Sequence, residues 1–250
     1  MLMFNNTIGN QVIKLKSVDS TNNYAAKLLK QTKIPFGTVI MARYQTDGKG
    51  QINGLWDAEE DSNLLMSVIL DTEFLTIEKV FFLSKVVALS LIGSLNQFGI
   101  KASIKWPNDI IVNRKKIAGV LIENQWLGHQ LSSSVIGIGL NVNQVVFPKS
   151  FNATSLKLIT SRLFVVEDVL KVVCHYLNQF YKLLIDLKFQ KIDLAYHEFL
   201  INYNELANFK EENEIFTAKV NGVNELGELV LQLNDGQVKF YKLKQITQLL

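Results

Sequence analysis

The 250-residue sequence contains a single cysteine, Cys174. An internal disulfide is therefore excluded, and a reducing cytoplasm is the expected compartment. Cys174 stands in an apolar, helix-like stretch, 172–177, which predicts an inert buried thiol. The first residues, 1–6, lack the basic region and long apolar run of a secretory signal, in agreement with a cytoplasmic protein.

Long apolar runs and strong charge imbalance are also lacking. No apolar stretch approaches the length that crosses a bilayer, so we expect no membrane partner. The net charge is +3 and the longest basic run is Arg114–Lys116, which allows anionic small molecules but does not predict a nucleic-acid surface. His129, His175 and His197 lie far apart without metal-ligand spacing, so we expect structural histidines and predict no protein-built metal site.

The chain otherwise has the composition of a globular protein, with 48% hydrophobic and 20% charged residues. Its length suits one sizeable domain with a small appendage. Apolar patterning predicts strands over 12–16, 38–42, 63–70, 109–113, 117–124 and 134–143. Helical spacing predicts a short helix after residues 19–22 and long helices over 76–98, 166–187 and 191–204.

Near Asn213 the pattern changes to short strands. These cover 216–220, 227–233 and 238–241 and are separated by the hairpin signals Asn-Gly and Asn-Asp-Gly. We predict an α+β fold with a large domain over 1–208 and a small β-barrel-like domain over 209–250.

A glycine-rich loop, Gln45–Gln51, follows the strand predicted over 38–42. Gly48 and Gly50 let backbone amides approach an anion closely, and Lys49 adds positive charge. The loop is not a Walker loop, because the lysine is followed by glycine and the upstream spacing differs. A solvated β-turn is the alternative interpretation.

Two further lysines are candidates for the same site. Lys105 follows a β-like segment and precedes Trp106–Asp109, where it can sit partly desolvated and polarise a phosphate or a carboxylate. Lys116 can supply a third cation. The alternatives are a surface lysine ahead of a hairpin for Lys105 and a solvated hairpin tip for Lys116.

The segment Gly137–Asn143 resembles a dinucleotide fingerprint only superficially, because Val142 stands at the last position and no helix follows. We interpret it as a strand whose glycines let a ligand lie against the backbone, with Asn141 offering its amide. Glycines that only relieve strand packing are the alternative.

Taken in order, six motifs resemble the catalytic core of the biotin protein ligases, or biotin–[acetyl-CoA-carboxylase] ligases. They are Asp19–Asn22, Gln45–Trp56, Asn63–Ser67, Lys105–Asp109, Lys116–Glu123 and Gly137–Asn143. Each motif is weak alone, and their order is the strong signal. The resemblance implies a mixed sheet flanked by helices, as in class II synthetases, and a C-terminal SH3-like barrel.

The resemblance also implies roles for particular residues. Lys49 and Lys105 would be catalytic. The biotin-binding set would be Ser20, Thr21, Asn22, Gln45, Gly48, Lys49, Gly50, Gln51 and Lys105. The set binding ATP or the adenylate would be Lys49, Gln51, Trp56, Lys105, Asn108, Lys116, Gly137, Gly139 and Asn141.

The implied reaction agrees with these residue types. The carboxylate of biotin must attack the α-phosphorus of ATP, so cations together with Mg²⁺ would offset the repulsion between two anions. A closing loop would then shield biotinyl-AMP from water until a lysine of a biotin carboxyl carrier protein arrives. The implied substrates are thus ATP and biotin, with Mg²⁺ and a carrier domain of acetyl-CoA carboxylase or a related carboxylase.

Two departures from the family pattern matter. Many members have an arginine-rich loop where this chain has Gln51 and Ile52, so more of the charge neutralisation should fall on Lys49 and Lys105. Residues 1–11, ahead of the first predicted strand, are too few for a helix-turn-helix. We therefore expect a monofunctional type without the DNA-binding domain and without repressor activity.

Two rival functions stay open. Lipoate ligases and octanoyltransferases share the fold class but would show an Arg-x-x-Gly-Gly-Gly loop, which is missing from this sequence. A biotin- or nucleotide-binding module without chemistry is suggested by the arginine-poor loop, although Lys49 and Lys105 weigh against it. An exposed edge strand makes a homodimer plausible.

Overall fold

The computed structural model describes residues 7–51, 54–148 and 151–249. Its centre is a seven-stranded sheet in the order β1-β2-β3-β7-β6-β5-β4. The strands are β1 (Val12–Val18), β2 (Val39–Gln45), β3 (Leu64–Asp71), β4 (Ser103–Lys105), β5 (Asp109–Val112), β6 (Lys115–Leu127) and β7 (Gln130–Leu140). β1 and β2 are parallel and the other neighbours are antiparallel, so the predicted mixed sheet is confirmed.

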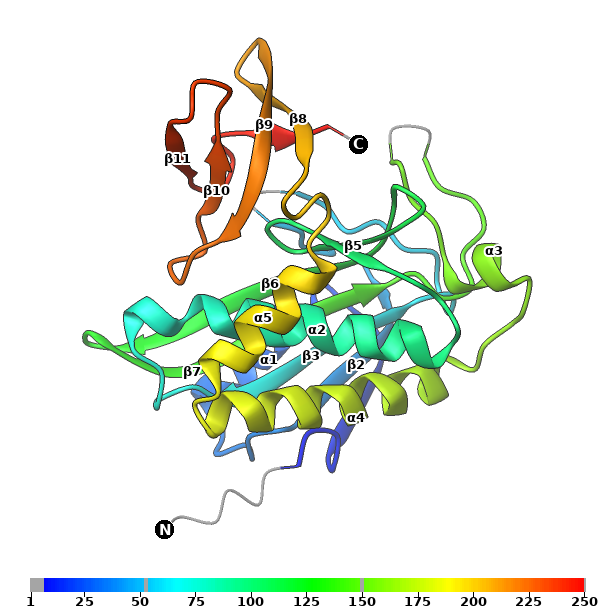
Figure 1. Cartoon of the computed structure of the whole chain (residues 1–250). Helices are drawn as coiled ribbons and strands as arrows, with labels where there is room; N and C mark the ends of the chain where they lie inside the picture. Colours follow the sequence, from blue (N-terminus) through cyan, green and yellow to red (C-terminus); the bar gives the residue numbers. More distant parts are fainter. Residues whose placement is uncertain (1–6, 52–53, 149–150, 250) are drawn as a thin grey trace.

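Helices cover both faces of this sheet (Figure 1). The helix α1 (Thr21–Gln31) packs on one face, where Ala25 meets Ile40, Ile69 and Val135. The opposite face carries α2 (Phe81–Gln97), α4 (Val166–Ile185) and α5 (Phe189–Phe199). Alternation along the strands explains this division, because successive side chains point to opposite faces.

A second sheet is formed by the C-terminal part of the chain. Its order is β11-β10-β9-β8-β12, with every pair antiparallel. The strands are β8 (Leu206–Glu211), β9 (Glu214–Val223), β10 (Leu229–Gln232), β11 (Val238–Tyr241) and β12 (Thr247–Gln248). Among the described residues β11 and β12 do not pair, so this sheet stays open and the expected closure into a barrel is not observed. Short outer strands explain this, because β12 offers little backbone for a closing ladder.

Two buried contacts join the second sheet to the rest of the molecule. The indole Nε1 of Trp106 donates to the Gly227 carbonyl at 2.9 Å. The fully buried ammonium of Lys85, on α2, forms an ion pair with Asp193 of α5 and donates to the Val223 carbonyl at 3.0 Å. These contacts place the open sheet against α2, α5 and the start of β5 (Figure 1).

Several element boundaries differ from the predictions. The helix expected from residue 76 begins at Phe81, after a short 3₁₀ turn, Ile77–Lys79. The helix expected over 191–204 ends at Phe199, because Leu200 adopts an extended backbone with φ −68° and ψ 123°. Three elements were not predicted at all: α3 (Leu156–Thr160), β8 and β12.

Residues outside the site fit structural roles. Cys174 is buried, and burial raises the pKa of its thiol to about 11, which leaves it protonated and inert. The ring of His197 accepts a hydrogen bond from the Val223 backbone N–H at 2.9 Å and so fastens α5 to β9. Within the described part of the chain, no helix is both long and apolar enough to cross a membrane.

Candidate active site

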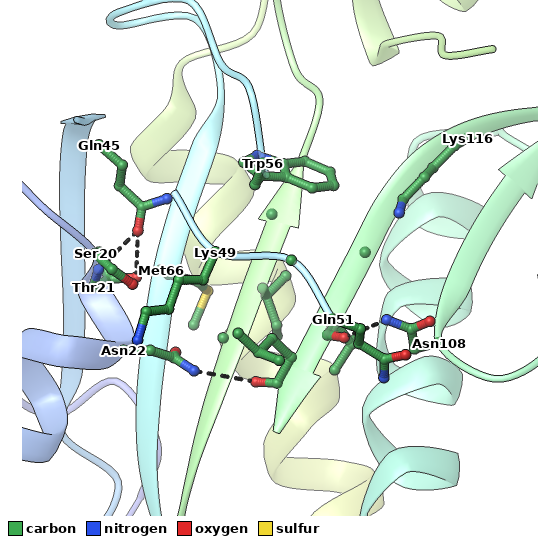
Figure 2. Close-up of a pocket in the computed structure, with 17 residues that line it drawn as sticks. Ser20, Thr21, Asn22, Gln45, Lys49, Gln51, Trp56, Met66, Asn108 and Lys116 are labelled. Carbon is green, nitrogen blue, oxygen red and sulfur yellow. Dashed lines mark hydrogen bonds between the residues drawn. The ribbon is translucent and has the colours of Figure 1, made fainter. Parts of the chain in front are cut away.

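A cavity of about 450 Å³ opens where the start of α1, the loop after β2 and the central strands meet (Figure 2). Most of the predicted ligand-binding residues line it, although they come from distant parts of the sequence. They are Ser20, Thr21, Asn22, Gln45, Lys49, Gly50, Gln51, Trp56, Asn108, Lys116, Gly137 and Gly139. Met66, of the Asn63–Ser67 motif, also lines the cavity, so the structure brings the glycine loop and residues from all five other predicted motifs into one site.

The parallel pairing of β1 and β2 explains why the first two motifs meet. A parallel pair needs a crossover helix, here α1, and both strands then end at the same edge of the sheet. Gln45 ends β2 directly beside Val18 of β1. The backbone N–H of Thr21 donates to Gln45 Oε1 at 2.8 Å, and its hydroxyl donates to the same oxygen at 3.1 Å. Both lone pairs of Oε1 are used, so Gln45 has only its Nε2 donor left for a ligand.

Asn22 is fixed even more firmly than Gln45. Its side chain is almost fully buried, and its Oδ1 accepts a hydrogen bond from the Ser67 hydroxyl at 2.6 Å. Its Nδ2 donates to the Glu123 carboxylate at 2.8 Å and to the Leu121 carbonyl at 3.4 Å. The two amide hydrogens are thereby committed, and Oδ1 keeps one lone pair free. Asn22 can therefore offer a ligand an acceptor only.

Gly137 is required by this arrangement. A Cβ at this position of β7 would lie 2.5 Å from Asn22 Oδ1, closer than real contacts allow. The neighbouring glycine, Gly139, has the same property toward Trp56, because a Cβ would overlap the indole ring. Both glycines thus leave room for side chains of the site, which is closer to the alternative of glycines that relieve packing than to the prediction of a ligand lying against the backbone.

The apolar floor of the cavity was not predicted. It is formed where three adjacent strands pass beneath the cavity at Met66, Ile138 and Val120, whose side chains belong to the main core on the face opposite α1, together with Gly119 and Leu121. Ile138 pairs with Met66 on one side and with Val120 on the other, so the three side chains share one face of the sheet. Strand alternation is visible in the sequence, but which strands are neighbours is not.

The glycine loop folds back on itself over the pocket. Lys49 and Leu55 form an isolated antiparallel bridge, and the Trp56 N–H donates to the Gly48 carbonyl at 2.8 Å. Gly48 is buried against Trp56 and does not line the cavity, whereas Gly50 does. The ammonium of Lys49 donates to Asn23 Oδ1 at 2.6 Å and is exposed to solvent. Ile52, whose identity departs from the family pattern, lies outside the described residues.

Trp56 and Lys116 separate this cavity from a second one. The indole lies against Gly119 and Gly139, and the Lys116 ammonium sits 5.5 Å from the ring centroid. Both residues also line a neighbouring hollow of about 570 Å³, formed with Leu55, Asp57, Asn141, Phe147, Phe151, Asn152 and Ala153. The Trp56 Nε1 is buried and has no hydrogen-bond partner among the described residues. The two cavities are therefore neighbours that share Trp56 and Lys116 as lining residues.

Lys105 occupies a different position from the other lysines. It ends β4, opposite Asp109 of β5, and is not among the residues that line the two cavities. Burial and the nearby charge of Lys116 lower the pKa of its ammonium, while the Asp109 carboxylate acts in the opposite direction. Asp109 also forms an ion pair with Lys116 at 2.6 Å. The three groups make one charge cluster beside the cavity, and the catalytic role of Lys105 stays a prediction.

The side-chain amides of Asn108 and Asn141 each donate a hydrogen bond to a backbone carbonyl. Asn108 Nδ2 donates to the Val120 carbonyl at 2.6 Å, which joins the turn after Lys105 to the cavity wall. Asn141 Nδ2 donates to the Thr154 carbonyl at 3.0 Å, and the residue lines the second hollow. The sequence assigned Asn108 and Asn141 to the nucleotide side of the site, and this assignment stays a prediction.

Comparison with known proteins identifies the group to which this architecture belongs. Residues 15–141 match the model of the biotin/lipoate A/B protein ligase family, and this segment contains all the residues that line the first cavity. The chain belongs to the biotin/lipoate A/B protein ligase family. The family resemblance stated from the motifs is thus confirmed, together with the mixed α+β fold.

Individual relatives agree with this assignment. The bifunctional ligase/repressor BirA of Bacillus subtilis is 30% identical over 227 residues, which cover 89% of this chain and 70% of that protein. The structure of the biotin protein ligase from Aquifex aeolicus in complex with biotin and ATP superposes with a TM-score of 0.79 and 28% identity. That comparison covers 96% of this chain and 98% of the other. The biotin–[acetyl-CoA-carboxylase] ligase of Mycobacterium tuberculosis is 29% identical over 48% of this chain and 45% of its own length.

Two residues that organise the site were missed as functional residues. Ser67 and Glu123 both stand inside recognised motifs, yet neither was assigned a role. Each contacts Asn22 through the register of its strand, so no local sequence signal distinguishes it. A polar residue at a position that should point into an apolar core is the signal that was available, because such a side chain needs a partner.

Proposed function

We propose that this chain is a biotin protein ligase. It activates biotin with ATP to biotinyl-5′-AMP and then transfers biotin to a lysine of a biotin carboxyl carrier protein. Membership of the family and the likeness to a ligase bound to biotin and ATP support the proposal. The relatives named biotin–[acetyl-CoA-carboxylase] ligase suggest the carrier domain of acetyl-CoA carboxylase or a related carboxylase as acceptor.

The observation that carries the choice of biotin is the polarity of the two fixed amides. Gln45 has a donor left for the ligand and Asn22 has an acceptor left. The ureido ring of biotin offers the complementary groups, one carbonyl and two N–H. The dithiolane of lipoate and the alkyl tail of octanoate offer neither, so they would leave the spare donor of Gln45 and the spare acceptor of Asn22 without a partner on the ligand. Such a loss typically costs ~10⁴-fold in discrimination at a site built for hydrogen bonding.

The first chemical step joins two anions. A biotin carboxylate oxygen attacks the α-phosphorus, a phosphorus–oxygen bond forms, and pyrophosphate leaves. We assign to Lys49, Lys105 and Lys116 the neutralisation of the charge that gathers on the phosphoryl oxygens. Among the described residues no three carboxylate, histidine or cysteine side chains gather as a metal site, so we propose that Mg²⁺ enters bound to ATP and adds charge neutralisation there.

In the second step the lysine amine of the carrier attacks the acyl carbon of biotinyl-AMP. An amide bond forms, the amine loses a proton, and AMP leaves with the electron pair of the broken bond. We assign to the loop Lys49–Gln51 and to Trp56, which line the cavity, the task of keeping water from the mixed anhydride.

Further parts of the proposal concern the chain as a whole. We assign residues 1–208 to the catalytic domain and 209–250 to the C-terminal β domain, and the start of β8 at Leu206 supports a boundary near that point. A cytoplasmic location and a homodimer through an edge strand such as β1 are also proposed.

Pyrophosphate release tests the assignment. The purified chain is incubated with ATP and Mg²⁺ and with biotin, lipoate or octanoate, and the retained acyl-AMP is identified by mass. We expect release and a retained adenylate with biotin. Release with lipoate or octanoate alone would move the chain to the sister branch of the family, and biotin binding without release would make it a binding module.

A further inference from the structure

Glu123 stands on β6 just outside the cavity, and its carboxylate contacts Asn22 rather than solvent alone. Its Oε2 accepts a hydrogen bond from Asn22 Nδ2 at 2.8 Å. Glu123 is half-buried, whereas Asn22 is 2% exposed. Glu123 is absent from the cavity lining, so any effect that it has on a ligand must act through Asn22.

The amide of Asn22 has two orientations of nearly equal shape, which exchange its oxygen and nitrogen. Its neighbours do not treat the two orientations alike. Glu123 and the Leu121 carbonyl can only accept hydrogen bonds, so they require Nδ2 on their side. The Ser67 hydroxyl can either donate or accept, so it fits both orientations. The Glu123 carboxylate makes the shorter of these two contacts, 2.8 Å against 3.4 Å for Leu121, and is therefore the main group that decides which atom of Asn22 faces the ligand.

We propose that Glu123 is a positioning residue that sets the specificity of the site. By holding Nδ2, it turns Asn22 Oδ1 toward the cavity, where the oxygen accepts an N–H of the ureido ring. This inference rests on the proposed function, because it assigns a partner within biotin. Without the carboxylate, Asn22 can turn its Nδ2 toward the ligand and place a donor against a donor.

The direct test compares three variants of the full chain. Glu123→Leu removes the acceptor and keeps a similar volume, and Glu123→Gln keeps an acceptor in its Oε1. Gln125→Leu is the matched control, because Gln125 lies two residues along the same strand and its side chain makes no hydrogen bond within the described residues. Biotin Kd, the KM for biotin and for ATP, kcat and the melting temperature are measured for each.

We expect Glu123→Leu to raise the Kd and KM for biotin ~10- to 100-fold, the size of one lost hydrogen bond to a buried group. The KM for ATP and kcat should stay within about twofold, and Glu123→Gln and Gln125→Leu should resemble the wild type. An unchanged biotin Kd in Glu123→Leu overturns the inference. An equal loss in kcat and in the KM for ATP also overturns it, because that result describes general damage.

A second test does not depend on the stability of Glu123→Leu. Asn22→Asp sets two carboxylates side by side and should weaken biotin binding. In the double variant Asn22→Asp/Glu123→Gln, the new glutamine Nε2 can donate to one oxygen of the new carboxylate, whose other oxygen still faces the ligand as an acceptor. We expect the double variant to recover at least ~10-fold in biotin affinity over Asn22→Asp, and no recovery overturns the inference.

The two proposals fail in different ways. A wild-type chain that does not bind biotin refutes the proposed function itself. A wild-type chain that binds biotin, with no response to the variants of Glu123, refutes only the positioning role of this residue.

Discussion

Two groups of polar side chains serve this site, and they are held in different ways. The amide cluster is made of Thr21, Asn22, Gln45, Ser67 and Glu123, and side-chain hydrogen bonds hold its two amides in place. The cation set, made of Lys49, Lys105 and Lys116, is exposed or half-buried, and two of its ammonium groups contact Asn23 and Asp109. The amide cluster is ready for a ligand, whereas a phosphate must replace Asn23 and Asp109 as partners of the lysines.

This difference separates recognition from catalysis. Groups that are already oriented lose little freedom when a ligand arrives, so the amide cluster should determine which acid binds. The cation set becomes effective only when an anion attracts it, so it should determine the rate of adenylation. Changes to the two groups should accordingly affect different kinetic constants.

The largest expected effect comes from breaking the amide cluster with Gly137→Val. The new side chain would occupy the space of Asn22 Oδ1 and displace the amide from both Ser67 and Glu123. Losing two such hydrogen bonds costs about 2–4 kcal/mol, so we expect biotin affinity to fall ~100-fold or more. Calorimetric titration with biotin measures it, and an unchanged KM for ATP serves as the control for folding. Biotin binding at wild-type strength would contradict the steric role of this glycine.

Removing a member of the cation set should have the next largest effect. We expect Lys105→Ala to lower the adenylation rate ~10- to 100-fold, since a charge-assisted contact is worth about 1.5–3 kcal/mol. Biotin affinity should change far less than the rate. Lys101→Ala is the matched control, because Lys101 is exposed and precedes the same strand. A wild-type rate in Lys105→Ala would remove Lys105 from the catalytic assignment.

The pH dependence of the adenylation rate should report the loss of the positive charge of Lys105. Burial lowers the pKa of Lys105 below its usual value of 10.5, so its positive charge is lost at a lower pH than that of an exposed lysine. Activity needs the charged form, and adenylation should therefore fall as pH rises through the lowered pKa. We expect this loss to begin below pH 10.5, and Lys105→Arg should remove the alkaline limb, since arginine stays charged. If the fall of the rate at alkaline pH persists in Lys105→Arg, another group is responsible for it.

The smallest expected effect comes from strengthening the cation set with Gln51→Arg. Gln51 lines the cavity but is not charged, and arginine restores the residue type that many family members carry. A partly exposed ion pair is worth about 0.2–1 kcal/mol, so the retention of the adenylate should improve only ~1.5- to 5-fold. Release of biotinyl-AMP, followed after dilution, measures the change. Faster release would show that Gln51 has a role that charge does not replace.

Prediction from sequence succeeded where the motifs themselves carry the contacts. Thr21 and Gln45 stand at motif positions and were both assigned to the ligand site, and the structure brings them together there. The elements around them were also found, because their apolar patterns are regular. The rejection of a dinucleotide fingerprint at residues 137–143 was also correct, since these residues form the end of a strand and the loop after it.

The contacts that were not predicted depend on strand order and side-chain geometry, and the order of residues along the chain does not contain this information. Glu123 meets Asn22 only because of where β6 lies in the sheet, and Met66 and Ile138 share a face for the same kind of reason. β8 was missed because it alternates poorly and has Phe209 as its one buried residue. Lys105 was expected within the ligand cavity, whereas it lies beside it in a charge cluster with Asp109 and Lys116.

The most direct test of the preformed amide cluster is a titration of the free chain with biotin, lipoate and octanoate in the absence of ATP. Binding measured in this way involves no phosphate, so the cation set contributes little. We predict that biotin binds and that lipoate and octanoate bind at least about 100-fold more weakly, because they leave Asn22 and Gln45 without partners. Equal binding of the three acids, or binding of biotin only after ATP is added, would contradict the account.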